Sequence, residues 1–184
     1  MAWYPYAKQV KTHSNWVSGL MIPPLHGLLL HITDGVKDKT TGEKVLGTIE
    51  NIGASFDKNN NSTHFAIAKS GEIWQFVDTD QRAKAMGGSW GDGKWISVEN
   101  FALPHEELTS GQILSVARLY GWLVNTKGIP LREVDVNKSR ADFDTGTERG
   151  LGGHSMYKDP DRQDCPGSAI LRQRALILSM VGAG

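Results

Sequence analysis

Three side chains of types that bind metal ions or act as nucleophiles stand next to apolar or glycine-rich segments. His31 lies near the end of the apolar run LLLHI, His154 follows a glycine pair, and Cys165 directly precedes a Pro-Gly pair. Catalytic zinc sites use three protein ligands of these types and keep a fourth position for water. A thiol beside a helix N-terminus or a metal has a lowered pKa, which also favours nucleophilic attack. The residues alone therefore leave three roles open for Cys165: zinc ligand, nucleophile activated by His154, or small buried apolar residue.

Three short apolar segments have the pattern and the flanking turn residues of β-strands. They cover residues 26–35, residues 63–78, which we expect to form a hairpin, and residues 94–100. The first strand runs into a Thr-Asp-Gly turn. We therefore expect His31 to lie at a strand end, where its side chain can project into a cleft.

Apolar residues recur at helical spacing in three other segments. We expect a helix over 44–57, a helix that starts at the capping-box residue Thr109 and ends at Gly128, and a last helix after Pro166. Residues 135–153 are polar and rich in glycine, which predicts a long surface loop. Strands and helices on one core indicate an α/β or α+β domain.

The composition limits the classes of partner. A chain of 184 residues suits one domain. Its formal net charge is zero, so neither nucleic acid nor a membrane surface meets a basic patch. The N-terminus lacks a secretory signal pattern, and no apolar run is long enough to span a bilayer. We expect synthesis in the cytoplasm and delivery by another route if the protein acts outside the cell.

Four motifs occur in a characteristic order along the chain: LLLHITDG, STHFAIAKSGEIWQFV, WISVEN and GGHSMYKDPDRQDCPG. This order resembles the zinc-dependent N-acetylmuramoyl-L-alanine amidases, a family that includes amidase-type phage lysozymes and the peptidoglycan recognition proteins. The resemblance implies a central mixed β-sheet flanked by helices in a single domain. It also implies an N-terminal extension over 1–24 and a catalytic domain over 25–184. The implied reaction is hydrolysis of the amide between N-acetylmuramic acid and L-alanine in peptidoglycan or muropeptides.

The resemblance also implies a ligand set, residue by residue. His31 and His154 match the first two Zn²⁺ ligands of the family. Cys165 matches the third, which is Cys in some members and Asp in others. Asp164 is a rival for this role, and alignment on the Pro-Gly pair favours Cys165.

The same comparison implies the catalytic residues. Glu99 in WISVEN matches a glutamate of many bacterial members, which makes it the implied general base; a solvated edge glutamate is the alternative. The ion would lower the pKa of a bound water and polarise the scissile carbonyl. Relatives often carry Lys or Thr two residues before the third ligand, where this chain has Gln163. Gln163 or its neighbour Arg162 is therefore the implied stabiliser of the oxyanion.

Several further residues are candidates for contact with substrate. His64, in the hairpin motif, either lines the site or is structural. Trp90 and Trp95 flank a glycine-rich segment that borders the implied sugar-peptide groove, with core packing as the alternative for each. The remaining histidines match nothing in the family pattern and are expected at the surface or in packing: His13, His26 and His105.

Two other functions stay open beside the amidase. One is a peptidoglycan-binding module that keeps the fold without cutting; the thiol ligand Cys165 favours the enzyme. The other is a cysteine peptidase that uses Cys165 and His154, which predicts inactivation by thiol alkylation and indifference to chelators. A phage endolysin, a toxin injected into a rival cell and a cytosolic recycling enzyme would all lack a signal peptide. In each setting we expect a monomer that acts on the cell wall or its fragments.

Overall fold

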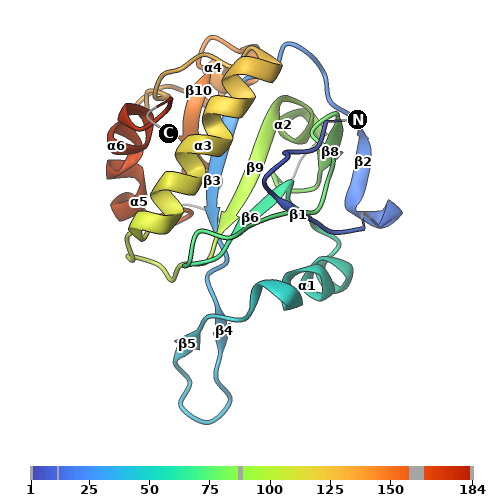
Figure 1. Ribbon diagram of the computed structural model, residues 1–184, viewed down its shortest axis with the longest axis vertical. Helices are drawn as coiled ribbons and strands as arrows, with labels where there is room; N and C mark the ends of the chain where they lie inside the picture. The colour runs from blue at the N-terminus through green and yellow to red at the C-terminus, as the bar shows by residue number, and fades with distance from the viewer. Residues whose placement is uncertain (1, 12, 87–88, 158–163, 183–184) are drawn as a thin grey trace.

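The computed structural model describes residues 2–11, 13–86, 89–157 and 164–182. Within these residues the centre of the molecule is a six-stranded mixed sheet (Figure 1). Its strands, in spatial order, are β1 (Lys8–Gln9), β7 (Ile73–Gln75), β6 (Phe65–Ile67), β9 (Trp95–Asn100), β3 (Gly27–Ile32) and β10 (Gly150–Gly153). Neighbouring strands run parallel except in the β6–β7 hairpin, which is antiparallel. The expected mixed sheet, the hairpin and the two central strands are confirmed.

One face of the sheet is covered by a long helix, α3 (Ser110–Lys127), which crosses in front of the strands in Figure 1. Its N-terminus is a complete capping box. The Thr109 side chain accepts a hydrogen bond from the Gln112 backbone N–H, and the Gln112 side chain accepts one from the Thr109 N–H. Gly128 ends the helix in the left-handed conformation with φ 65°. The expected helix is confirmed at both ends.

The main core lies between α3 and this face of the sheet. Alternate residues of the central strands point into it, which is the period of a β-strand. The buried members from the two sides are Leu28, Leu30, Ile96 and Val98 from the strands, and Val116, Leu119, Tyr120 and Leu123 from α3. The short helices α5 (Ser168–Arg172) and α6 (Arg174–Ser179) complete this layer beside α3. The single helix expected after Pro166 is thus divided into two.

Two smaller apolar clusters pack on the opposite face of the sheet. The first joins α1 (Ile52–Asn59) and the short helices η1 (Ser14–Trp16) and η2 (Ile49–Asn51) to the β6–β7 hairpin. The second joins α4 (Arg140–Thr145) and η3 (His154–Tyr157) to β3 and β9. The smaller elements around them are β2 (Val17–Leu20), β4 (Val36–Lys37), β5 (Lys44–Val45), β8 (Gln81–Ala83) and α2 (Ser89–Lys94).

The segment before residue 25, expected as an extension, contributes to both faces. Its β1 pairs with β7 at one edge of the sheet. Its β2 pairs with β8. Tyr4 and Trp16 are 3% and 2% exposed and belong to two different apolar clusters.

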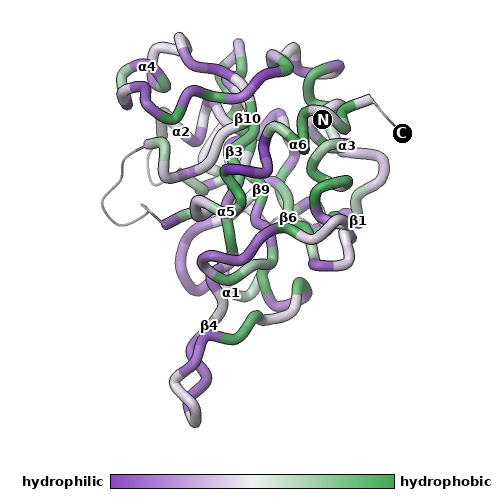
Figure 2. The backbone as a smooth tube through the Cα atoms, turned by 90° about the vertical axis from the view of Figure 1, so that its left-hand side faces the viewer, coloured by the Kyte–Doolittle hydropathy of each residue, from purple (hydrophilic) through white to green (hydrophobic). Residues whose placement is uncertain are grey.

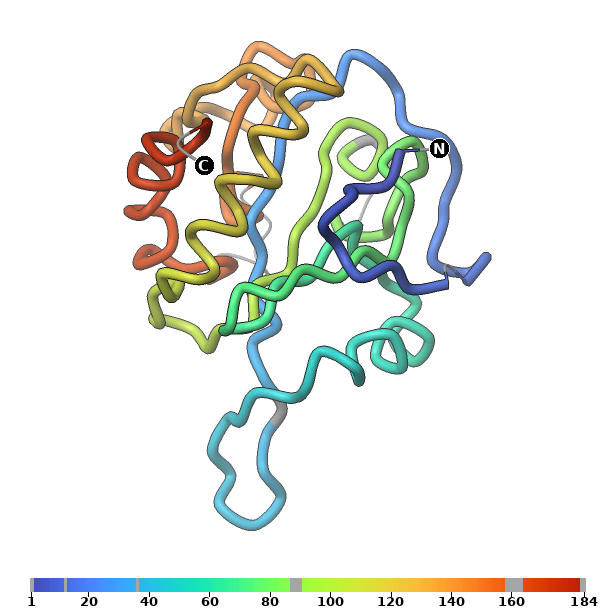
Figure 3. Tube along the Cα trace, in the orientation of Figure 1, coloured from blue at the N-terminus to red at the C-terminus, as the bar shows by residue number. Residues whose placement is uncertain are grey.

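Directly after β3 the chain leaves the body of the molecule as the β4–β5 hairpin. Figure 3 shows this hairpin projecting from the end of the sheet, and Figure 2 shows that it is mostly hydrophilic. The helix expected over 44–57 is therefore wrong in its first half. Val45 pairs with Val36 in the hairpin, and Gly47 disfavours a helix before residue 49. Only Ile49, Ile52 and Phe56 of the expected apolar stripe are buried.

The long loop expected over 135–153 is wrong, because this segment contains α4 and the edge strand β10. Ser139 and Asp142 form a capping box that starts α4. The four residues of β10 are all buried and pair in register with β3. Glycine lets the two backbones approach: a Cβ on Gly27 would overlap the carbonyl oxygen of Gly150.

Within the described residues, no helix combines the length and the apolarity needed to cross a membrane.

Candidate metal centre and active site

His31 is the fifth residue of β3 and is 3% exposed. Side chains alternate along a strand, so Leu30 and Ile32 enter the core beneath α3 and His31 points to the opposite face. Its register partner on the adjacent parallel strand β9 is Glu99. Residues in register on parallel neighbours project from the same face, so this half-buried carboxyl group lies on the His31 side of the sheet.

His154 comes to the same place from β10. Gly153, the last residue of β10, pairs with Leu30, so the chain leaves the sheet beside His31 and turns into η3. His154 is 4% exposed. The centroids of the two imidazole rings are 4.6 Å apart, with an angle of 51° between the ring planes.

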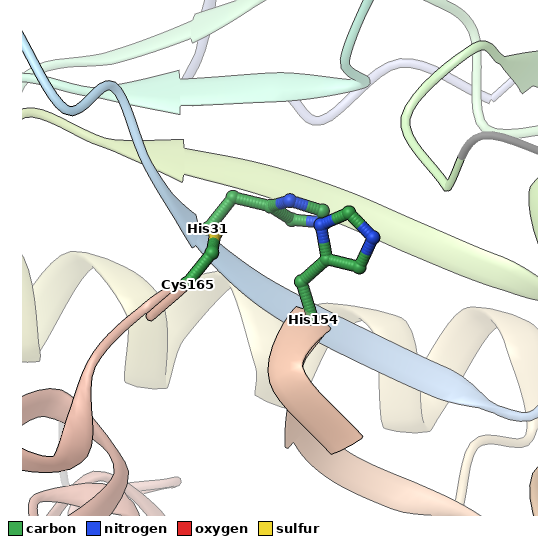
Figure 4. Close-up of side chains that lie close together, drawn as sticks. All are labelled: His31, His154 and Cys165. Atoms are coloured by element: carbon green, nitrogen blue, oxygen red, sulfur yellow. The ribbon is translucent and has the colours of Figure 1, made fainter. Parts of the chain in front are cut away.

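Cys165 completes the group from the segment that leads into α5 (Figure 4). One ligand atom from each of His31, His154 and Cys165 lies within 4.8 Å of the other two. The Ser155 backbone N–H donates a hydrogen bond of 2.6 Å to the Cys165 carbonyl, which ties the Cys165 segment to η3. Cys165 is partly buried and packs against the main core. Three elements that are distant in sequence thus meet in one cluster.

The donor set of this cluster fits a metal ion. Two imidazoles and one thiolate are ligands that zinc takes in catalytic sites, at about 2.0–2.3 Å from each donor atom. Three protein ligands leave one position open. Asp164 is exposed and does not belong to the cluster.

His64 directly precedes β6 and contacts Ser97, which lies on the same face of β9 as Glu99. Its Nδ1 accepts a hydrogen bond of 3.1 Å from the Ser97 N–H, and its Nε2 lies 3.0 Å from the Gln81 carbonyl. Burial lowers the pKa of His64 to about 4, so the ring is neutral at pH 7. His64 is 1% exposed, and its ring joins β8 to β9 from its place before β6.

Of the remaining expected site residues, the structure describes the side chain of Trp95 but not those of Trp90, Arg162 and Gln163. Trp95 is 1% exposed and packs edge-on against His26 and Tyr157, so it belongs to the core. The side chain of Trp90 lies outside the described residues, although its backbone is part of α2. Arg162 and Gln163 also lie outside the described residues.

The three unmatched histidines are surface or packing residues, as expected. His13 is exposed and stacks on Trp16 with ring centroids 4.4 Å apart. His26 is buried, and burial lowers its pKa to about 4. His105 lies in a loop with φ 73° and is exposed.

Comparison with protein families decides the identity. Residues 23–168 match the family model described as N-acetylmuramoyl-L-alanine amidase. The chain belongs to this family. This amidase is therefore a hydrolase of the amide that joins N-acetylmuramic acid to L-alanine in peptidoglycan. Comparison with curated protein sequences gives no match.

Solved structures share the fold of the amidase over nearly its whole length. An N-acetylmuramoyl-L-alanine amidase LysC from Clostridium intestinale URNW is 17% identical, with TM-score 0.61; the alignment covers 94% of this chain and 97% of LysC. The hydrolase AmiA from Staphylococcus aureus is 15% identical, with TM-score 0.59, over 98% of this chain and 82% of AmiA. A structure of PlyL is 15% identical, with TM-score 0.61, over 95% of this chain and 96% of PlyL. At these identities the likeness establishes the fold.

Sequence reasoning missed the strand that positions His154. The signal was the glycine pair directly before this histidine, which was interpreted as part of a loop. Gly152 lies against Leu29 and Met156, and Gly153 against Pro166 and Leu171, at distances that leave no room for a side chain. A glycine pair next to a candidate ligand can therefore indicate close backbone packing as well as a loop.

Proposed function

We propose that this amidase is zinc-dependent and that His31, His154 and Cys165 hold the ion. The observation that supports the proposal is the approach of their three ligand atoms to within 4.8 Å of one another. The two imidazoles are buried and the thiol is partly buried, so water competes little for the donors. Bound zinc would lower the pKa of a water and polarise the scissile carbonyl.

Glu99 is proposed as the general base and acid of the reaction. The register pairing of Glu99 with His31 supports this role, because residues in register on parallel strands project from the same face. A carboxylate there takes a proton from the attacking water and returns it to the leaving amine of L-alanine. Gln163 or Arg162 is proposed to donate a hydrogen bond to the oxyanion, because both immediately precede the Cys165 segment.

The proposed substrate is polymeric peptidoglycan or soluble muropeptides, reached in the wall after release or delivery, or inside the cell. Zinc bound to one chain at three of its own side chains requires no second subunit, so a monomer is the proposed active form. The substrate of the family carries no nucleic acid or lipid part that the chain would have to recognise. Relative turnover on purified sacculi and on soluble muropeptides distinguishes the two settings.

The test combines metal analysis with identification of products. We expect about one zinc ion per chain, loss of activity in a chelator, and recovery on return of zinc. Mass spectrometry of digested sacculi should show peptides with a free L-alanine amine and glycans with a free lactyl carboxyl group. Full activity in metal-free protein would overturn the zinc proposal.

The cysteine-peptidase mechanism, with Cys165 as nucleophile and His154 as its base, is the second candidate for the reaction, because the same distance limit relates the two residues. It requires inactivation by a thiol-alkylating reagent after the metal has been removed, with no effect of the chelator alone. The amidase proposal requires the chelator to inactivate and zinc to protect Cys165 from alkylation. The two outcomes exclude each other.

A further inference from the structure

A groove with a volume of about 930 Å³ lies along α3, on the opposite side of the sheet from His31 and His154. The outer surface of α3 forms one part of its lining. The rest comes from the segment that ends in β1, the β6–β7 turn with the start of β7, Leu131 and the residues after α6. Since α3 covers the face to which Leu30 points, and His31 points to the other face, the groove is separate from the candidate metal centre (Figure 1).

Three aromatic rings follow one another in this groove. The ring centroids of Trp122 and Tyr4 are 5.3 Å apart, and those of Tyr4 and Tyr6 are 5.6 Å apart. Tyr4 is buried and supports the other two, whereas Tyr6 is 81% exposed. Tyrosine and tryptophan combine a flat apolar face with a polar edge and lose little conformational entropy on binding. The ring planes of Tyr4 and Tyr6 are 71° apart and those of Tyr4 and Trp122 58°, so the buried Tyr4 ring packs edge-on or tilted against the two outer rings and holds them in place.

Charged and amide side chains surround the aromatic row. Lys8, Glu72, Arg118 and Asn125 line the same groove and are exposed. One carboxylate beside two cationic side chains leaves the groove without a strong charge of one sign. A polyanion would therefore gain little binding free energy there. Guanidinium, carboxylate and amide groups are planar and offer paired donors or acceptors. Such groups match the neighbouring hydroxyl and N-acetyl groups of a neutral sugar chain.

We propose that this groove is a second binding site for the glycan strand of peptidoglycan, a chain of N-acetylated hexosamines. The flat C–H faces of the sugars stack on Tyr6 and Trp122, and their hydroxyl and N-acetyl groups bond to Arg118, Asn125 and Glu72. The choice of this glycan rests on the proposed function, because the substrate of that reaction is built on it. A site that holds the polymer outside the catalytic cleft raises the local concentration of amide bonds there.

The direct test is a binding titration of the full chain with a peptide-free tetramer of N-acetylglucosamine, followed by NMR or calorimetry. We expect saturable binding that is the same with and without a chelator. Tyr6→Ala should weaken binding about tenfold, whereas Tyr6→Phe, which keeps the stacking face, should not. Leu176→Ala is the matched control, since Leu176 is 50% exposed on α6 and does not line the groove.

A second measurement relates the groove to turnover. Tyr6→Ala should raise the apparent KM on insoluble sacculi and leave kcat/KM on a soluble muramoyl peptide unchanged. The proposal is overturned if the tetramer does not bind, if it binds Tyr6→Ala as tightly as the natural chain, or if the NMR changes centre on His31. Concentration-dependent dimers that Tyr6→Ala abolishes would overturn it in favour of a second copy of the chain. If the tetramer binds but the protein cleaves no amide, the proposed function is wrong and the proposed glycan site in the groove still stands.

Discussion

Gly153 and Pro166 are in contact across the candidate metal centre, so closely that a Cβ on Gly153 would lie 2.5 Å from Cδ of Pro166. Gly153 directly precedes His154, and Pro166 directly follows Cys165. The contact therefore holds the segments of two proposed ligands close together. A second neighbouring atom, Cδ2 of Leu171, would lie 2.8 Å from the added Cβ. The proline ring is buried and rigid, so the added Cβ displaces the backbone around it.

Gly153→Ala is expected to move the His154 and Cys165 segments apart and to weaken metal binding by roughly 10–100-fold, the usual effect of disturbing the support of a ligand. Competition with a chromophoric chelator measures this affinity. Gly47→Ala is the matched control, because a Cβ at Gly47 meets nothing within 4 Å. An unchanged affinity in a folded Gly153→Ala variant would contradict the proposed role of the contact.

Cys165→Ser is expected to lose the metal, because a neutral hydroxyl is a poor replacement for a thiolate. Asp164→Ala is the paired variant and is expected to keep it, since Asp164 is exposed and outside the cluster. The metal content per chain, measured by elemental analysis, separates the two. If Asp164→Ala loses the metal and Cys165→Ser keeps it, the third ligand is Asp164 and not Cys165.

Glu99→Gln is expected to keep the metal and to lower kcat by roughly 10²–10⁴-fold, because an amide of the same shape cannot accept the proton of the attacking water. Turnover on a soluble muramoyl peptide, together with metal analysis of the same sample, provides the readout. Glu107→Gln, at an exposed position, serves as the control. Near-natural turnover of Glu99→Gln would remove this residue from the mechanism.

Acid is expected to destabilise the fold through His64. Burial lowers the pKa of this imidazole from 6.5 to about 4, so the folded state holds it neutral. The unfolded chain takes up a proton below about pH 6.5 and the folded chain only near pH 4, so stability falls as the pH falls through this window. Full loss of this contribution is on the order of 3 kcal/mol.

Denaturant unfolding at about pH 7 and about pH 4.5 measures the effect. His64→Gln should lose less stability between the two values than the natural chain. His26 acts in the same direction, and Asp92 acts in the opposite one, because burial raises the pKa of Asp92 to about 6. His26 and Asp92 are present in both the natural chain and the His64→Gln variant. The difference in acid response between these two proteins therefore isolates the contribution of His64. Equal slopes in the two proteins would show that His64 does not control the acid response.

The sequence by itself determined the elements whose signals are local. The strand that carries His31 near its end is a nearly continuous apolar run, and a strand buried on both faces requires such a run. The helix after Thr109 carries its own start and stop in a capping box and a left-handed glycine. The amidase family follows from motifs that lie in order along the chain, and residues 23–168 match the family model.

Only the tertiary structure decided which distant residues meet. Glu99 stands opposite His31 because β9 pairs with β3 in one register, and a shift by one residue would place it on the other face. The segment before His154 is an edge strand, although its glycines resemble a loop, because close backbone approach leaves no room for side chains. Contacts of this kind depend on neighbours that are far away in the chain, so a local pattern such as a glycine pair does not by itself show which residues meet.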